Sequence, residues 1–263
     1  LAFLPNGDLL ISDFGTHNIK RYSTSTNLVS LYAGQRYYFD PVDGVGSAAK
    51  LNNPFCLSRS ASGDIWFSQN QAIVRRVNAA GNLTTILNED PNAAPKGVGA
   101  GACVLKVNED GSFISAATVR RELRLYSPTG QILKTLAAQI EFAFPLYAAV
   151  NANGDIFFNN KSGGISKYSG GVVSEFTQPI YKSCQGCTLS GLAFTKTGDL
   201  IAARSSSIVK VSASGTVTEL TGSESKGDLK DGTTAEALFS GIKGLAVDSN
   251  GAIYVVQQSG SVI

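Results

Sequence analysis

The chain has 263 residues, of which 43% are hydrophobic and only 16% are charged, and its net charge at pH 7 is +2. This small net charge gives no general attraction to nucleic acid or anionic membranes, and no apolar stretch approaches the roughly 20 residues that span a bilayer. The sequence contains no Met and begins abruptly with Leu1-Ala2-Phe3. We therefore expect an excerpt from a longer precursor.

A glycine in a turn before a short apolar strand recurs along the whole chain. Each glycine separates an apolar run from a β-branched or aromatic run, which is the pattern of a tight hairpin. Neighbouring glycines are 43 to 56 residues apart. In chain order they are Gly7, Gly63, Gly111, Gly154, Gly198 and Gly251.

Two further strands follow most of these hairpins. In the first repeat they are expected at residues 19–22 and 28–31, and similar pairs follow the next four glycines. Four short strands in a unit of roughly 40–50 residues are typical of a propeller blade. We predict an all-β, six-bladed β-propeller with four-stranded antiparallel blades, the last of them incomplete. The prediction is a single domain over residues 1–263, with blades at about 1–34, 55–88, 102–138, 147–178, 191–222 and 244–263.

Two longer loops between blades match each other. Residues 43–51 follow Gly34, and residues 231–239 follow Gly222. In both, an Asp-Gly turn leads into an Ala-rich step that suits one helical turn, and an apolar residue then follows to fill the space between blades. With the hairpins, this pattern resembles the NHL-repeat family over nearly all of the chain. The resemblance implies a propeller fold and says little about function.

The four cysteines allow one or two disulfides. Cys184 and Cys187 form a C-x-x-C pair, which could be a zinc half-site, a redox motif or a tight disulfide. We expect a disulfide there, with free thiols as the alternative. Cys56 and Cys103 occupy near-equivalent places in consecutive repeats, so they are either neighbours that could be bridged or buried thiols.

The sequence offers few residues that could bind a catalytic metal ion or form a catalytic triad. Lactonases and paraoxonases of related six-bladed folds hold a divalent ion with Glu, Asp and Asn in the central channel, and an amidating lyase of NHL type uses histidine-bound zinc. The corresponding positions here lie just before each innermost strand and contain no carboxylate. The single histidine, His17, cannot form a histidine-rich zinc site, and its place at the start of a third strand puts it far from the propeller axis. We therefore predict no catalytic residue, no metal and no cofactor.

Other candidate positions have competing interpretations. Basic residues recur on the third strands, which could form an RNA-binding face or ordinary solvated strands. Asn82 and Asn160 begin glycosylation sequons. Aromatic residues in loops between blades could form a partner-binding patch or pack between blades. They are Tyr37, Tyr38, Phe39, Phe142, Phe144 and Tyr147.

These observations favour a non-enzymatic interaction or scaffold propeller in a secreted or cell-surface protein, with a protein or larger assembly as its partner. Low charge, the expected C-x-x-C disulfide and the sequons support this location. The first alternative is a channel-centred lactonase-like or hydrolase-like enzyme, which an axial divalent ion would favour. The second is an RNA-binding NHL module, which would need a continuous positive face.

Overall fold

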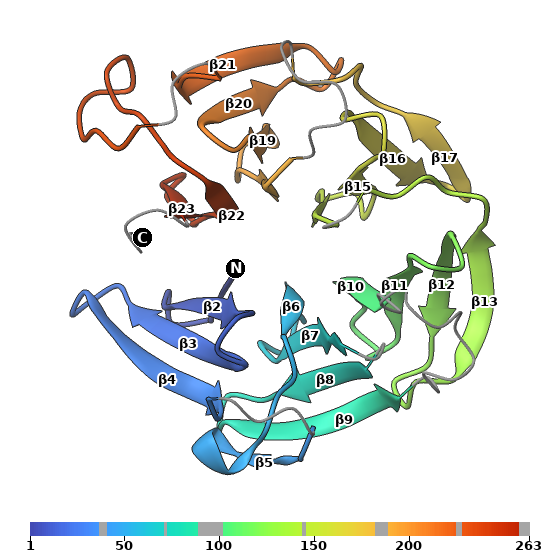
Figure 1. Cartoon of the computed structure of the whole chain (residues 1–263). Coiled ribbons are helices and arrows are strands. Elements are labelled where there is room, and N and C mark those ends of the chain that lie inside the picture. The colour runs from blue at the N-terminus through green and yellow to red at the C-terminus, as the bar shows by residue number, and fades with distance from the viewer. Residues whose placement is uncertain are drawn as a thin grey trace. The chain divides into compact units, whose positions relative to one another are not determined.

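The computed structural model describes residues 1–36, 41–70, 73–88, 102–143, 146–181, 189–224 and 228–257, and these residues are mostly β-strands (Figure 1). The chain divides into two compact units, unit 1 (Leu1–Ile140) and unit 2 (Glu141–Ile263). No helix in these described ranges is long and apolar enough to cross a membrane.

Unit 1 contains three antiparallel four-stranded blades, each with its strands hydrogen-bonded in chain order. The first blade consists of β1 (Ala2–Phe3), β2 (Leu9–Asp13), β3 (Asn18–Ser23) and β4 (Leu28–Gly34). The second consists of β6 (Phe55–Arg59), β7 (Ile65–Gln69), β8 (Ile73–Val77) and β9 (Asn82–Asn88). The third consists of β10 (Ala102–Val107), β11 (Phe113–Ala117), β12 (Glu122–Tyr126) and β13 (Ile132–Ala137).

A short extra strand extends the second blade. β5 (Gly44–Val45) pairs with the outer edge of β9, and the 3-10 helix η1 (Gly46–Ala48) follows it directly. The loop that links the first two blades is therefore part of the second sheet.

Unit 2 contains two more four-stranded blades and a two-stranded sheet. The fourth blade consists of β14 (Ala148–Val150), β15 (Ile156–Asn159), β16 (Ile165–Ser169) and β17 (Val172–Glu175). The fifth consists of β18 (Gly191–Phe194), β19 (Leu200–Ala203), β20 (Ser207–Val211) and β21 (Val217–Gly222). The two-stranded sheet consists of β22 (Ile242–Val247) and β23 (Ile253–Gln257).

The all-β propeller architecture is confirmed, but the prediction of six blades is wrong, because the structure has five. The hairpin at Gly251 forms as its sequence predicts, with β22 and β23 antiparallel. A hairpin is only half of a four-stranded blade, and no third or fourth strand joins this sheet within the described residues. Within the described residues the last repeat is therefore a two-stranded hairpin.

The hairpin glycines form the turns that their sequence pattern predicts. Gly7 has a φ of +87° and donates its N–H to the Leu4 carbonyl oxygen at 3.0 Å, and Gly154 has a φ of +83° and makes the same bond to Asn151 at 3.0 Å. Glycine adopts this region without the clash that a Cβ atom would cause. These turns fix the pairing of the first two strands in a blade.

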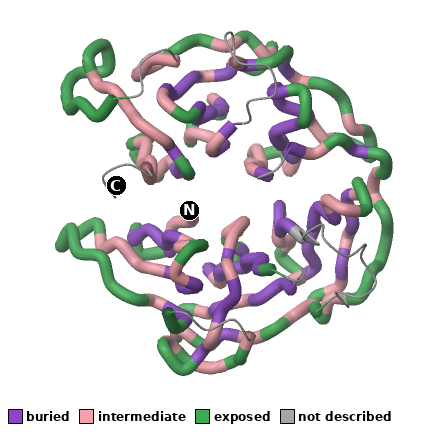
Figure 2. Tube along the Cα trace, in the orientation of Figure 1, coloured by how far each residue is buried: buried purple, intermediate pink, exposed green. Residues whose placement is uncertain are grey.

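Packing between neighbouring blades forms the core. Figure 2 shows the buried residues along the inner and middle strands, whereas outer strands such as β4 and β13 are mostly exposed. In unit 1, Trp66 lies 5.1 Å from Phe113, whose ring stacks on Tyr126 at 5.0 Å. These rings belong to adjacent blades, so their contact joins the second blade to the third.

The aspartates that follow the hairpin glycines neutralise cations on the neighbouring third strand. Asp155 accepts hydrogen bonds from Ser169 Oγ at 2.5 Å and Asn151 Nδ2 at 3.1 Å, and its carboxylate lies 2.8 Å from Lys167 Nζ. These bonds, chiefly that from Lys167, lower the pKa of Asp155 to about 2. The carboxylate is therefore better stabilised in the folded chain than in the unfolded chain.

The lowered pKa predicts how Asp155 contributes to acid stability. Its stabilisation is complete above the ordinary value of 3.8 and is lost as the pH falls through about 2. We expect Asp155→Asn to reduce the change in melting temperature between these pH values, measured by circular dichroism. The matched control is Asp199→Asn, because the carboxylate of Asp199 lies 3.9 Å from Lys210 Nζ. An acid profile as steep in Asp155→Asn as in the unchanged chain would contradict the assignment.

Candidate functional site

A hydrogen-bonded loop network surrounds the single histidine in unit 1. The Asn53 backbone N–H donates to His17 Nδ1 at 3.1 Å, and Asn53 Nδ2 donates to the Phe14 carbonyl oxygen at 2.9 Å. Asn70 Nδ2 donates to Asn53 Oδ1 at 3.0 Å. The ring of His17 is buried, at 5% exposure, and one of its two nitrogens is committed to holding the loop.

His17 occupies a turn whose backbone conformation recurs in another blade. It has a φ of +58°, and Arg121 has the same φ at the equivalent turn before β12. Arg121 Nη2 also contacts the following loop, at 3.4 Å from the Gln139 carbonyl oxygen. A residue in the left-handed region that reaches to the next loop is thus a repeated feature of the fold. His17 fits this role without any catalytic one.

The described residues contain no cluster of metal ligands, whereas two of the four cysteines form a disulfide. Across the described ranges, no group of three or more His, Cys, Asp or Glu side chains could hold a metal ion. A disulfide joins Cys56 in β6 to Cys103 in β10, with the Cα atoms 5.4 Å apart. It connects the innermost strands of the second and third blades. Cys184 and Cys187 lie outside the described residues.

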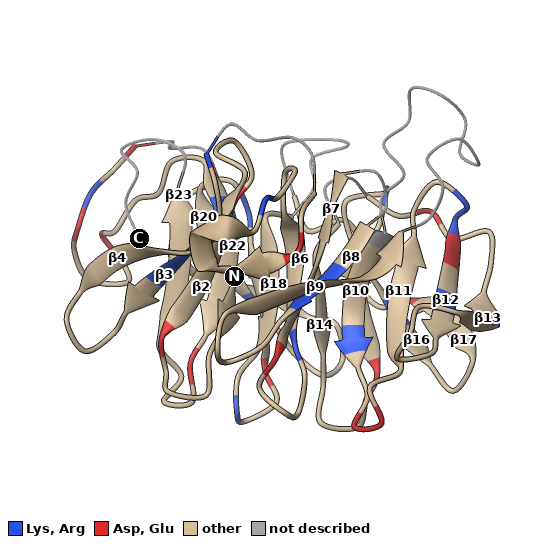
Figure 3. Ribbon diagram, turned by 90° about the horizontal axis from the view of Figure 1, so that it is seen from below, with Lys and Arg blue, Asp and Glu red and all other residues tan. Residues whose placement is uncertain are grey.

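The recurring basic residues of the third strands are largely paired with acids. Figure 3 shows Lys and Arg interspersed with Asp and Glu along the strands and loops. Most of the acidic partners lie on or beside the second strand of the same blade, so each pair neutralises one strand face. The pairs are Lys20–Asp13, Arg21–Asp8, Arg76–Asp64, Arg124–Glu122, Lys167–Asp155 and Lys210–Asp199.

The predicted aromatic patch lies mostly outside the described residues, which exclude Tyr37, Tyr38, Phe39 and Phe144. The other two aromatic residues, Phe142 and Tyr147, make contacts within the chain. Phe142 lies 5.3 Å from the Phe158 ring, and the Tyr147 hydroxyl donates to the Lys243 carbonyl oxygen at 3.1 Å. Burial raises the pKa of Tyr147 to about 12.

The two sequons differ in accessibility. Asn82 is exposed at the start of β9. Asn160 is buried, and its Nδ2, the atom that a glycan would modify, donates to Ser166 Oγ at 3.1 Å. Of the two, only Asn82 presents its side chain for modification in the folded chain.

The second strand of the two-stranded sheet in unit 2, β23, has one strand partner among the described residues. One edge of β23 pairs with β22, and no described strand pairs with the other edge. Ile253 and Val255 pack against the cluster of Ile201, Ile208 and Leu245. Because side chains alternate along a strand, Tyr254 and Val256 face the opposite side, and both are half-buried. Among the described strands β23 therefore pairs with β22 alone, and it has a partly apolar face.

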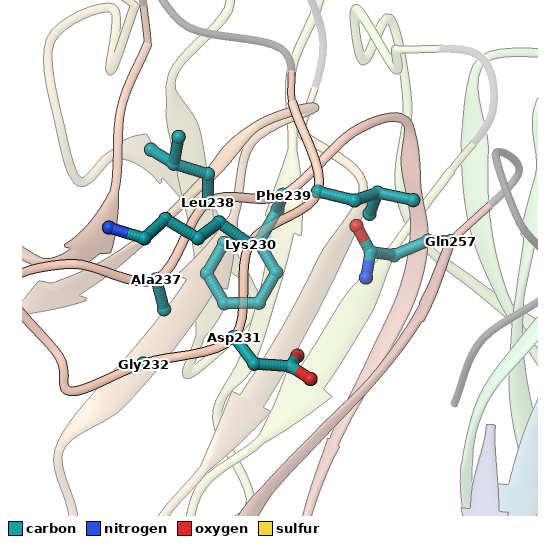
Figure 4. Close-up of a pocket in the computed structure, with 8 residues that line it drawn as sticks. Lys230, Asp231, Gly232, Ala237, Leu238, Phe239 and Gln257 are labelled. Atoms are coloured by element: carbon teal, nitrogen blue, oxygen red, sulfur yellow. The ribbon is translucent and has the colours of Figure 1, made fainter.

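A pocket of about 420 Å³ lies at the end of β23 (Figure 4). The Asp231 carboxylate and the Gln257 amide point toward the same space beside the Phe239 ring, whereas the Lys230 side chain extends away from it. The pocket is lined by Leu229, Lys230, Asp231, Gly232, Ala237, Leu238, Phe239 and Gln257.

Sequence reasoning did not identify this pocket as a site. The available signal is the match between residues 43–51 and 231–239, which by itself predicts only two equivalent spacers between blades. The match also concerns side chains that accept hydrogen bonds, since each loop begins with Asp-Gly. Only the structure shows that one of these loops encloses an arginine and the other an open pocket.

Comparisons with known proteins show the fold. No family model matches the chain, and no curated protein matches it. Solved β-propeller structures match nearly its whole length. A catalytically inactive histidine-to-alanine variant of virginiamycin B lyase from Staphylococcus aureus, with quinupristin, is 13% identical and matches with a TM-score of 0.61, over 99% of this chain and 84% of that one.

Two further solved structures represent other activities. A gluconolactonase from Xanthomonas campestris is 11% identical, with a TM-score of 0.65 over 96% of this chain and 80% of that one. A chain of the nidogen/laminin complex is 10% identical, with a TM-score of 0.65 over 95% of this chain and 85% of that one. At these identities the matches establish the propeller fold, which supports lyases, lactonases and binding proteins alike.

Proposed function

We propose that this chain is a non-enzymatic protein-interaction propeller of a secreted or cell-surface protein, and that it binds a partner at β23. The observation that carries the proposal is the partly apolar face of this strand, which ends at the pocket of Asp231 and Gln257. A segment of a partner can lie against such a face, while the pocket selects one of its polar side chains.

The surroundings of β23 suit this mode of binding. Tyr254 and Val256 provide a partly apolar face on this strand, and tyrosine is enriched among the residues that dominate binding energy at protein interfaces. The pocket at Asp231 and Gln257 adds polar selectivity at the end of the strand. The Cys56–Cys103 disulfide supports an oxidising location, because such bonds persist mainly outside the cytosol.

Site-specific photo-cross-linking tests the proposal. A photoreactive phenylalanine analogue at position 254 should cross-link an extracellular partner in cell-surface extracts, and the same group at Tyr168 on β16 serves as the matched control. The affinity of the purified partner should then fall at least about tenfold with Tyr254→Lys, the loss expected for an aromatic contact at the centre of an interface.

Two outcomes would contradict the proposal. One is a cross-linked partner whose affinity is unchanged by Tyr254→Lys. The other is a turnover activity that His17→Ala abolishes, with unchanged circular dichroism, and that Tyr254→Lys leaves intact. The second result would place the function in the loop network of unit 1.

A further inference from the structure

One hydrogen bond determines which end of the Gln257 amide is available to a ligand. Its Oε1 accepts the Ser240 backbone N–H at 2.8 Å. A backbone N–H can only donate, so the atom that faces it must be the amide oxygen. The amide nitrogen is therefore turned the other way, and Figure 4 shows it on the side of the Asp231 carboxylate. Within the part of the chain that the structure describes, this nitrogen donates no hydrogen bond.

The Asp231 carboxylate is the second polar group of the pocket. Among the described residues it accepts no hydrogen bond and forms no ion pair, and the neighbouring Lys230 side chain extends away from it (Figure 4). A carboxylate accepts hydrogen bonds, whereas an amide nitrogen donates them. The pocket thus has one acceptor and one donor that face the same space.

The ring of Phe239 forms an apolar wall beside these two groups. Phe239 is half-buried, and it packs against the cluster that contains Ile201, Ile208 and Leu245. This packing holds the ring in place, and Figure 4 shows the ring beside the space between the carboxylate and the amide. An aromatic ring presents a flat apolar surface whose negative face attracts C–H groups.

Together these groups favour a neutral ligand that both donates and accepts hydrogen bonds. A cation would satisfy Asp231 and leave the N–H groups of Gln257 without an acceptor, and an anion would be repelled by the carboxylate. Neighbouring hydroxyls of a sugar suit both groups, because each hydroxyl donates and accepts. The C–H groups on one face of a sugar ring are apolar and can pack on Phe239.

The size of the pocket favours a sugar over a single amide side chain, which also donates and accepts. Its volume of about 420 Å³ is much larger than one amide group needs. It lies within the range of small-molecule sites, which is on the order of 300–1,000 Å³. A sugar ring can fill this space and reach both polar groups.

The matching loop of unit 1 shows how a cation is held instead. Gln69 ends β7 as Gln257 ends β23, and its Oε1 accepts from Arg75 Nη1 at 3.3 Å. Asp43 Oδ1 accepts from Arg75 Nη2 at 2.7 Å, so both side-chain oxygens face one guanidinium group. In unit 2 the glutamine oxygen is already bonded to Ser240. The second loop therefore offers a donor where the first offers an acceptor.

We propose that the pocket at Asp231, Gln257 and Phe239 is a binding site for a neutral sugar ring, carried on a side chain of the partner. Adjacent hydroxyls of the sugar donate to the Asp231 carboxylate and accept from Gln257 Nε2, while its apolar face packs on the Phe239 ring. The inference deepens the proposed function and rests on it, because it names the group that the partner places in the pocket.

Methyl glycosides of glucose, galactose, mannose and N-acetylglucosamine are the probes for the site. Titrated into the whole chain, at least one should shift the amide resonances of residues 229–239 and of the Gln257 side chain. It should bind at least about tenfold more tightly than glycerol, which has adjacent hydroxyls but no ring to pack on Phe239. The sugar assignment is overturned if none of the four shifts these resonances, or if N-acetyl-arginine amide binds more tightly than all of them.

Variants of the chain separate the two roles of Gln257. Gln257→Glu keeps an oxygen for the Ser240 N–H but, when ionised, has no donor. We therefore expect an unchanged circular dichroism spectrum and a loss of at least about tenfold in sugar affinity. Asp231→Ala should weaken the sugar by a similar factor, whereas the matched control Asp228→Ala, at an exposed aspartate in the same loop, should have no effect. Binding that is unchanged in either pocket variant overturns the site.

Removing the glycans of the partner tests the source of the sugar. After enzymatic deglycosylation, the partner captured through position 254 should bind at least about tenfold more weakly. If the methyl glycosides bind but deglycosylation changes nothing, the pocket is a site for free saccharides and the link to the partner is overturned. If no glycoside binds while Tyr254→Lys still weakens the partner, the sugar site is overturned and the proposed function stands.

Discussion

Removing the Cys56–Cys103 disulfide is expected to lower the free energy of unfolding of unit 1 by about 4 kcal/mol. The bond closes a loop between residues 47 positions apart, and the loss of unfolded-chain entropy for a loop of this length corresponds to about 4 kcal/mol. Cys103 is buried at 3% exposure, so alanine is the suitable replacement at both positions. Guanidinium chloride unfolding of Cys56→Ala/Cys103→Ala measures the effect.

The single tryptophan makes this measurement specific to one unit. Trp66 belongs to unit 1, is 3% exposed and packs on Phe113, so its fluorescence reports the unfolding of this unit. A reductant should destabilise the unchanged chain and leave the fluorescence transition of the double variant unchanged. A loss below about 1 kcal/mol would mean that the bond constrains the unfolded chain far less than its loop length implies.

The repeating hairpins were predictable from sequence because their causes are local. An Asx-Gly turn between two apolar runs determines both the chain reversal and the pairing of its flanks. Gly7 and Gly154 show the same turn with almost the same φ. The structure confirms an all-β propeller for the same reason, since each blade is mainly such hairpins in sequence.

The number of blades was not predictable in this way. Counting hairpin glycines gives six repeats, but a blade also needs its third and fourth strands, which pair with residues outside the hairpin. The sheet of β22 and β23 has neither of these strands within the described residues. The local turn signal thus predicted the hairpin correctly, but it overestimated the number of strands in this sheet.

The candidate site was missed because it depends on contacts between distant residues. The sequence predicts either a nucleic-acid-binding face or a solvated strand face for the basic residues of the third strands, yet Arg75 is fully buried and bonded to Asp43, 32 positions away. Nothing in the Arg-Arg pair of β8 indicates which arginine is enclosed. The matching loops are visible in the sequence, but only the structure shows that the first of them encloses the guanidinium of Arg75.

The last prediction compares the two loops directly. Asp43→Ala should destabilise unit 1 by about 2–3 kcal/mol, because it leaves the buried guanidinium of Arg75 without its counter-charge. The estimate lies below the usual cost of breaking a buried ion pair because the Asp43 side chain is 50% exposed. Asp43 also accepts the Thr85 backbone N–H at 3.0 Å, so its loss should loosen β9.

Asp231→Ala is the matched control, since the same substitution is made at the equivalent position of the second loop. It removes an exposed carboxylate with no cation on it among the described residues, so stability should change by no more than about 0.5 kcal/mol. Chemical unfolding followed by circular dichroism compares the two variants. If both lose the same stability, Asp231 already makes an interaction within the folded chain that is as strong as the ion pair of Asp43 with Arg75.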